Sequence, residues 1–110
     1  MLITKKENYI LVTSEEENFT EFYKKFKDNY GYIKDGHLII HISKKISIEN
    51  KDFLLFLDIA EEKQQNGTSF VIVNSVIDID NFPESLNIVP TLQEAEDILE
   101  MEAIERELGF

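Results

Sequence analysis

Two different spacings of apolar residues alternate along this chain and predict where its strands and helices lie. Short β-prone runs, several of them almost continuously apolar, predict strands buried within a sheet. These runs occupy residues 2–5, 9–14, 37–43, 69–74 and 86–89. Lys6-Glu7-Asn8 separates the first two runs, so we expect them to form a hairpin.

Between the second and third runs the apolar residues recur at helical spacing. Five aromatic residues stand at i, i+3, i+4, i+7 and i+11, so they share one face of a helix. They are Phe19, Phe22, Tyr23, Phe26 and Tyr30. We interpret this stripe as the core-facing side of the helix rather than as a cofactor or base-stacking site. Asn18, with Glu21 three residues later, is a suitable N-cap.

Two further helices are predicted downstream. The first spans about residues 50–65 and ends at Asn66-Gly67. Its expected buried residues are Phe53, Leu54, Phe56, Leu57 and Ala60. The second opens at Thr91, whose hydroxyl can cap the Glu94 amide, and runs to about Leu108. Residues 75–85 are expected to form a loop with at most one helical turn.

The order of these elements predicts an α/β fold. We expect a mostly parallel sheet of four to five strands with an N-terminal hairpin, three main helices and a long C-terminal helix. With 110 residues, the chain is expected to form a single domain, residues 1–110. In such sheets ligands bind beyond the carboxyl ends of the strands, which here lie near Ser14, Ser43 and Asn74.

Charge is distributed unevenly along the chain, whose formal net charge is −11. Residues 64–110 contain ten acidic residues and a single basic one, Arg106. This balance disfavours nucleic acid as a partner, whereas an acidic face could meet a basic protein or simply keep the chain soluble. There is no cysteine, no leader-like N-terminus and no apolar run of about 20 residues, so we expect a cytoplasmic protein without membrane contact.

Residues that could support catalysis are few. His37 and His41 share one face of a predicted strand, but no cysteine or adjacent acid completes a metal site around them. The many carboxylates are interpreted as solvated helix surface, and no phosphate-binding loop or nucleophile elbow is present. We therefore expect no enzymatic activity, no metal and no cofactor.

Three stretches follow one another as strand, helix–turn–strand and strand–helix. They are residues 37–42, residues 53–73 with the Asn66-Gly67 turn, and residues 86–95. Together they resemble the STAS domain, the fold of bacterial anti-sigma-factor antagonists. The first stretch looks like the central strand that delivers the family's switch loop. The resemblance covers nearly the whole chain and implies a STAS-like fold with a regulatory role in protein–protein interaction.

The phosphorylation motif of that family is not matched. The family places Asp-Ser-Ser/Thr-Gly at the start of the helix after the central strand, where a partner kinase phosphorylates the serine. The corresponding stretch here is Glu49-Asn50-Lys51-Asp52, so no phospho-switch of that kind is expected, and Asn50 is expected to cap the helix instead. Small chains of this type are also associated with ribonuclease Z, but the sequence lacks its His-x-His-x-Asp-His motif, so we do not expect that activity.

The last helix has apolar residues well beyond the part expected to dock on the sheet. The docking residues are expected to be Leu92, Ala95, Ile98 and Leu99. The apolar spacing then continues through Met101, Ile104, Leu108 and Phe110. This distal end either overhangs the sheet and meets a partner or folds back over the edge of its own core.

We therefore predict a non-enzymatic regulatory or scaffold module that binds another protein, either a different chain or a second copy through the C-terminal helix. The predicted partner-binding residues lie on the loop of residues 43–52 and on the last helix. They are Ser43, Lys44, Lys45, Asn50, Lys51, Met101, Ile104, Leu108 and Phe110. A small-ligand-binding domain using the carboxyl ends of the strands is the alternative, and an enzyme of unknown type ranks third.

Overall fold

A mixed sheet forms the centre of the computed structural model, which describes residues 1–75 and 86–109. Within these residues five strands lie side by side in chain order. They are β1 (Leu2–Lys5), β2 (Ile10–Thr13), β3 (Leu38–His41), β4 (Phe70–Val73) and β5 (Asn87–Val89). β1 is antiparallel to β2, and every later pair is parallel. The predicted N-terminal hairpin and mostly parallel sheet are therefore confirmed.

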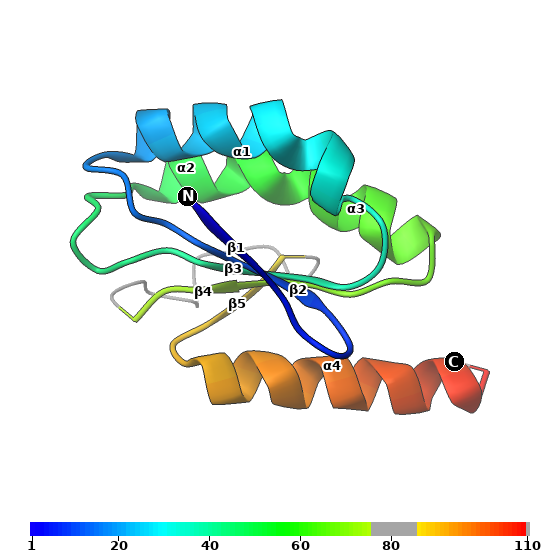
Figure 1. Ribbon diagram of the computed structural model, residues 1–110. Coiled ribbons are helices and arrows are strands. Elements are labelled where there is room, and N and C mark those ends of the chain that lie inside the picture. The colour runs from blue at the N-terminus through cyan, green and yellow to red at the C-terminus, as the bar shows by residue number, and fades with distance from the viewer. Residues whose placement is uncertain (76–85, 110) are drawn as a thin grey trace.

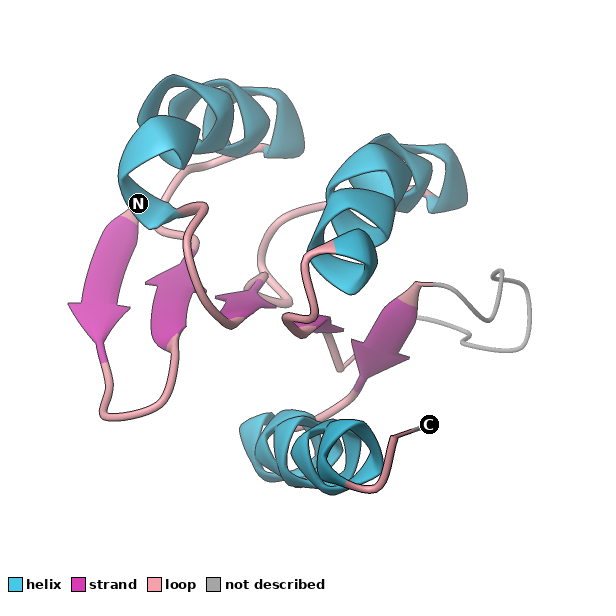
Figure 2. Ribbon diagram, turned by 90° about the vertical axis from the view of Figure 1, so that its right-hand side faces the viewer, coloured by secondary structure: helices cyan, strands magenta, loops and turns pink. Residues whose placement is uncertain are grey.

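Helices cover both faces of this sheet. The helical elements are α1 (Phe19–Ile33), α2 (Asn50–Phe53), the 3₁₀ turn η1 (Leu54–Phe56), α3 (Leu57–Gln65) and α4 (Leu92–Glu107). Figure 1 shows α1, α2 and α3 on one face and α4 alone on the other. In the turned view of Figure 2 the sheet lies between these two layers. No helix in the described parts of the chain is long and apolar enough to cross a membrane.

The aromatic stripe of α1 packs into the larger core, as its spacing predicts. Phe19, Phe22 and Phe26 are buried against the sheet and against the second helical segment. Phe56 lies among them, with its ring centroid 5.6 Å from that of Phe26. Asn18 caps the helix by accepting a hydrogen bond from the Glu21 amide at 2.9 Å. The stripe is therefore core packing, and the predicted N-cap is confirmed.

The second helical segment differs from its prediction in two details. Phe53 and Phe56 are both fully buried, whereas Leu54, which was expected in the core, is exposed. The reason is η1, because three residues per turn place positions i and i+3 on the same side and push Leu54 and Leu55 outward. The N-cap is Glu49 rather than Asn50, and the Glu49 amide donates to Asp52 Oδ2 at 3.0 Å.

A smaller cluster fills the space between the sheet and α4. Ala95 and Leu99 are buried against apolar residues of β2, β3 and β4, and Leu92 and Ile98 pack at the edge of this cluster. Thr91 caps α4 by accepting a hydrogen bond from the Glu94 amide at 3.2 Å. The predicted docking residues are thus confirmed. The prediction of a loop falls mostly on residues 76–85, which lie outside the described residues.

Candidate interaction surfaces

The polar residues at the carboxyl ends of the strands hold loops in place. Ser14 Oγ, after β2, accepts a hydrogen bond from the Ser43 amide at 2.8 Å. Asn74, after β4, donates from Nδ2 to the Ile42 carbonyl at 3.2 Å. Ser14 and Asn74 are both buried, so these side chains fix the start of the loop that leaves β3.

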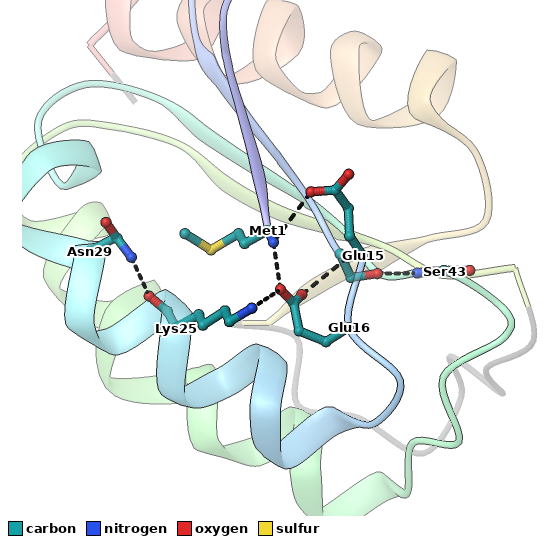
Figure 3. Close-up of polar contacts among 7 residues, drawn as sticks. Met1, Glu15, Glu16, Lys25, Asn29 and Ser43 are labelled. Atoms are coloured by element: carbon teal, nitrogen blue, oxygen red, sulfur yellow. Dashed lines mark hydrogen bonds and ion pairs between the residues drawn. The ribbon is translucent and has the colours of Figure 1, made fainter.

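Glu16 forms a second anchor close to this edge of the sheet. Figure 3 shows its carboxylate between the Met1 amino group and Lys25, whose Nζ lies 3.3 Å from Oε2. Burial works against ionisation of this side chain. Hydrogen bonds from the Met1 amino group, from backbone amides and from Lys25 outweigh that effect and lower the pKa of Glu16 to about 2. The ion pairs fasten the start of β1 to the segment that leads into α1.

The loop of residues 43–49, which joins β3 to α2, exposes most of its predicted partner-binding residues. Its apolar anchor is Ile46, which is buried in the larger core. Lys44, Lys45 and Asn50 are exposed, while Ser43 is half-buried with Oγ accepting from the Lys45 amide at 3.1 Å. Lys51 is exposed and its Nζ lies 3.3 Å from Glu49 Oε2. The loop therefore presents lysines on a fixed backbone, with exposed Leu54 and Leu55 following in sequence.

The two halves of α4 turn different kinds of side chain toward the sheet. In residues 92–99 the inward side is apolar, through Ala95 and Leu99. In residues 100–107 it is polar. Glu102 Oε2 accepts from Asn87 Nδ2 at 3.3 Å, and Arg106 donates to Ser69 Oγ at 3.2 Å. The helix therefore stays against the sheet as far as Arg106 and does not overhang.

The apolar residues of the distal half lie on the other side of this helix. Met101, Ile104 and Leu108 are 53%, 56% and 66% exposed. At about 100° per residue, they point away from the side that carries Ala95, Leu99, Glu102 and Arg106. We call these three residues the outer stripe. They do not cover the core edge, and Phe110 lies outside the described residues.

A groove of about 740 Å³ runs along the flank of α4 beside the β1–β2 turn. Figure 1 shows this turn reaching down to α4. The groove is lined by Glu7, Tyr9, His37, Glu96, Leu99 and Glu100, among others. We call it the acidic groove because three of these residues are glutamates. Sequence reasoning missed it, since its walls come from three distant segments.

Two ionisable side chains of the acidic groove are held by hydrogen bonds. The Tyr9 hydroxyl donates to Glu96 Oε2 at 2.7 Å, and burial together with this glutamate raises the pKa of Tyr9 to about 12. His37 Nδ1 accepts from the Ser69 amide at 2.9 Å. Burial, and then the positive charges of Arg106 and Lys63, lower the pKa of His37. The hydrogen bond and the lowered pKa both favour the neutral form of the His37 ring.

Metal-ligating side chains do not gather in the part of the chain that the structure describes. Residues 1–75 and 86–109 contain no group of three or more histidines or acids placed to hold an ion. Lys63, another buried charged group, donates from Nζ to the carbonyls of Lys34 and Gly36. It fixes the α1–β3 connection, so we assign it a structural role.

Comparison with known proteins identifies the fold. No family model matches this sequence, and no curated protein matches it. Among solved structures, a chain described under the heading "Molecular architecture of the stressosome, a signal integration and transduction hub" superposes with a TM-score of 0.58. The match covers 93% of this chain and 98% of that chain at 18% identity, and the stressosome chain is a STAS-domain protein. The fold is STAS-like.

Residues 37–42, 53–73 and 86–95 resemble the STAS domain in sequence, and this resemblance implied a STAS-like fold. The structure confirms that fold. These stretches form β3, the segment from the end of α2 through β4, and β5 with the start of α4. The stretch Glu49-Asn50-Lys51-Asp52, which the resemblance places at the family's switch position, forms the beginning of α2. This segment serves here as a capped helix start that exposes Asn50 and Lys51.

Proposed function

We propose that this STAS-like chain is a non-enzymatic regulatory or scaffold module that acts in the cytoplasm by binding another protein. The outer stripe carries this proposal. Three large apolar side chains lie on the solvent side of a helix whose contacts with the sheet are made by other residues. Apolar side chains clustered on the exposed side of a docked element are typical of protein-interaction sites.

The loop of residues 43–49 and the start of α2 are the second proposed contact. Ser43, Lys44, Lys45, Asn50 and Lys51 lie on a loop and helix start held by Ile46 and by the Ser14 hydrogen bond. A fixed backbone lowers the entropy lost when the loop binds a partner. The similarity to a chain of the stressosome, a signal integration and transduction hub, supports a regulatory assembly rather than an isolated protein.

The polar groups at the carboxyl ends of the strands do not favour the alternative of a small-ligand site. Ser14 Oγ and Asn74 Nδ2 are hydrogen-bonded to the main chain of Ser43 and Ile42. A ligand using these atoms would have to break bonds that hold the loop. Protein binding is therefore the function that these contacts favour.

The two proposed contacts can be tested separately by quantitative affinity capture from native lysate. One variant replaces Met101, Ile104 and Leu108 with serine, and another replaces Lys44, Lys45 and Lys51 with serine. Tyr32→Ser is the matched control, because Tyr32 is an 83% exposed aromatic residue on α1, across the sheet from α4.

We expect the wild type and Tyr32→Ser to retain the same specific partner and the outer-stripe variant to lose it. A smaller loss is expected for the lysine variant. Thermal unfolding verifies that each variant is folded. If folded outer-stripe and lysine variants both capture the partner as well as the wild type does, neither surface is the binding site. If the wild type itself retains no specific partner, the proposed function is wrong.

A further inference from the structure

The outer stripe and the acidic groove form one continuous surface on α4. Glu100 lines the groove, and Ile104 of the outer stripe follows it by one helical turn on the same side of the helix. Glu96, one turn before Glu100, also lines the groove. A partner lying along α4 therefore meets apolar side chains and carboxylates together.

The negative charge of this surface favours a positively charged partner. α4 contains seven acidic residues and one basic residue, Arg106, which is turned toward Ser69 at the sheet. Glu7 from the β1–β2 turn adds a further carboxylate on the opposite wall of the groove. No positive charge of this chain lines the groove within the residues that the structure describes. The positive charges that act on its His37 wall are those of Arg106 and Lys63, and Arg106 is turned to the sheet. A cation supplied from outside would therefore meet the carboxylates of Glu7, Glu96 and Glu100.

The groove also has an apolar portion that suits the stem of a long basic side chain. Leu99 and Ala103 line it alongside the carboxylates. Lysine and arginine bury their methylene stems on apolar surface while the charged head contacts polar groups. A lysine or an arginine can therefore pack its stem on Leu99 and Ala103 and place its charged group beside the carboxylates.

We propose that the outer face of α4 binds a basic amphipathic helix of another protein, which packs apolar side chains on the outer stripe and inserts one lysine or arginine into the acidic groove. This inference rests on the proposed function and names the class of partner. A second copy bound through its own α4 is disfavoured, because two strongly acidic helices would lie against each other. Nucleic acid is disfavoured for the same reason.

The test uses the full chain and a labelled synthetic peptide of about 18 residues, or five helical turns, with leucines on one face and lysines elsewhere. A second peptide replaces every lysine with glutamate, and a third keeps the lysines but scrambles the order. Fluorescence anisotropy measures each affinity. We expect the basic amphipathic peptide to bind at least about tenfold more tightly than either control, and more weakly as salt screens the carboxylates.

Protein variants locate the contact. Glu7→Gln with Glu100→Gln removes two groove charges at exposed positions, and Asp58→Asn with Glu61→Gln removes two exposed charges from α3 on the other face of the sheet. Both double variants change the net charge equally. We expect the groove variant to weaken peptide binding several-fold and the α3 variant to leave it unchanged. The outer-stripe serine variant should weaken it by at least about tenfold.

Three results would overturn this inference. The glutamate peptide could bind as tightly as the lysine peptide, or the two charge variants could behave alike. Alternatively, sedimentation could show that the chain pairs with itself through the outer stripe, in which case the occupant is a second copy. Each result leaves the proposed function standing if lysate capture still depends on the outer stripe. Failure of the wild type to retain any specific partner from lysate would instead refute the proposed function itself.

Discussion

The two halves of α4 follow opposite rules although they belong to one uninterrupted helix. Residues 92–99 turn Ala95 and Leu99 into a buried cluster, as an amphipathic helix on a sheet is expected to do. Residues 100–107 turn Glu102 and Arg106 to the sheet and leave Met101 and Ile104 exposed. Apolar spacing therefore identifies one face of a helix but does not show whether that face packs on the sheet or faces solvent. In the first half the apolar residues pack in the core, whereas in the second half they are exposed to solvent.

The largest expected effect concerns the docked half. Leu99→Ala removes a buried side chain from the cluster between α4 and the sheet, so we expect the free energy of unfolding to fall by about 3 kcal/mol. Urea denaturation measures this change. Met101→Ala, two residues away but on the exposed side, is the control. Similar losses for both variants would show that the two halves do not differ as described.

A smaller effect is expected where the distal half meets the sheet through polar contacts. Arg106→Ala deletes the hydrogen bond to Ser69 Oγ and should cost about 1 kcal/mol of unfolding free energy. The same urea experiment applies, and Glu107→Ala, an exposed neighbour, should have little effect. A change of several kcal/mol at Arg106 would mean that the distal half is as important to stability as the docked half.

Acidification should weaken the same polar region through His37. Its pKa in the folded state is lowered below the ordinary value of 6.5 by burial and by Arg106 and Lys63, with Glu102 acting in the opposite direction. The unfolded chain therefore binds more protons just below pH 6.5, and folded-state stability should decline as the pH falls from 6.5 toward the folded pKa.

His37→Asn isolates this effect, because Asn Oδ1 stands at the same distance along the side chain as His Nδ1, so it can still accept from the Ser69 amide but does not titrate. The variant should lose the part of the pH dependence that lies just below pH 6.5. If wild type and variant have identical stability profiles across that range, the stated environment of His37 is incorrect.

The smallest expected change in stability is at the outer stripe. Ile104→Ser replaces an exposed apolar side chain, so the unfolding free energy should stay within about 0.5 kcal/mol of the wild type. Partner capture by the same variant should nevertheless decrease. A loss of stability comparable to that of Leu99→Ala would assign Ile104 to the core instead.

Local patterns in the sequence are sufficient to predict much of this fold. The aromatic stripe of α1, the caps Asn18 and Thr91, and the docking of Ala95 and Leu99 depend on neighbours within a few turns of the same element. The exposure of Leu54 could not be predicted in this way, because it depends on the helix tightening into η1. Helical spacing alone treats positions 53, 54 and 57 as one face.

The candidate surfaces were harder to predict from the sequence, because residues from distant segments form them. The polar inward side of the distal half of α4 depends on Asn87 and Ser69, which reach it from two different strands. The acidic groove depends on the β1–β2 turn and His37 lying beside α4. Only the tertiary arrangement brings these segments together. The exposed lysines of the β3–α2 loop, by contrast, lie in one short stretch and were predicted.

Amide chemical-shift mapping shows directly whether the distal half of α4 is a binding surface. The ¹⁵N-labelled full chain is titrated with the basic amphipathic peptide, and shifts are followed for all assigned backbone amides. We predict that the largest changes fall on the second half of α4 and its C-cap, from Glu100 to Leu108, and on the turn that carries Glu7 and Tyr9, with α1 unaffected. Saturable shifts confined to α1 or to the loop of residues 43–49, with α4 unchanged, would contradict the account.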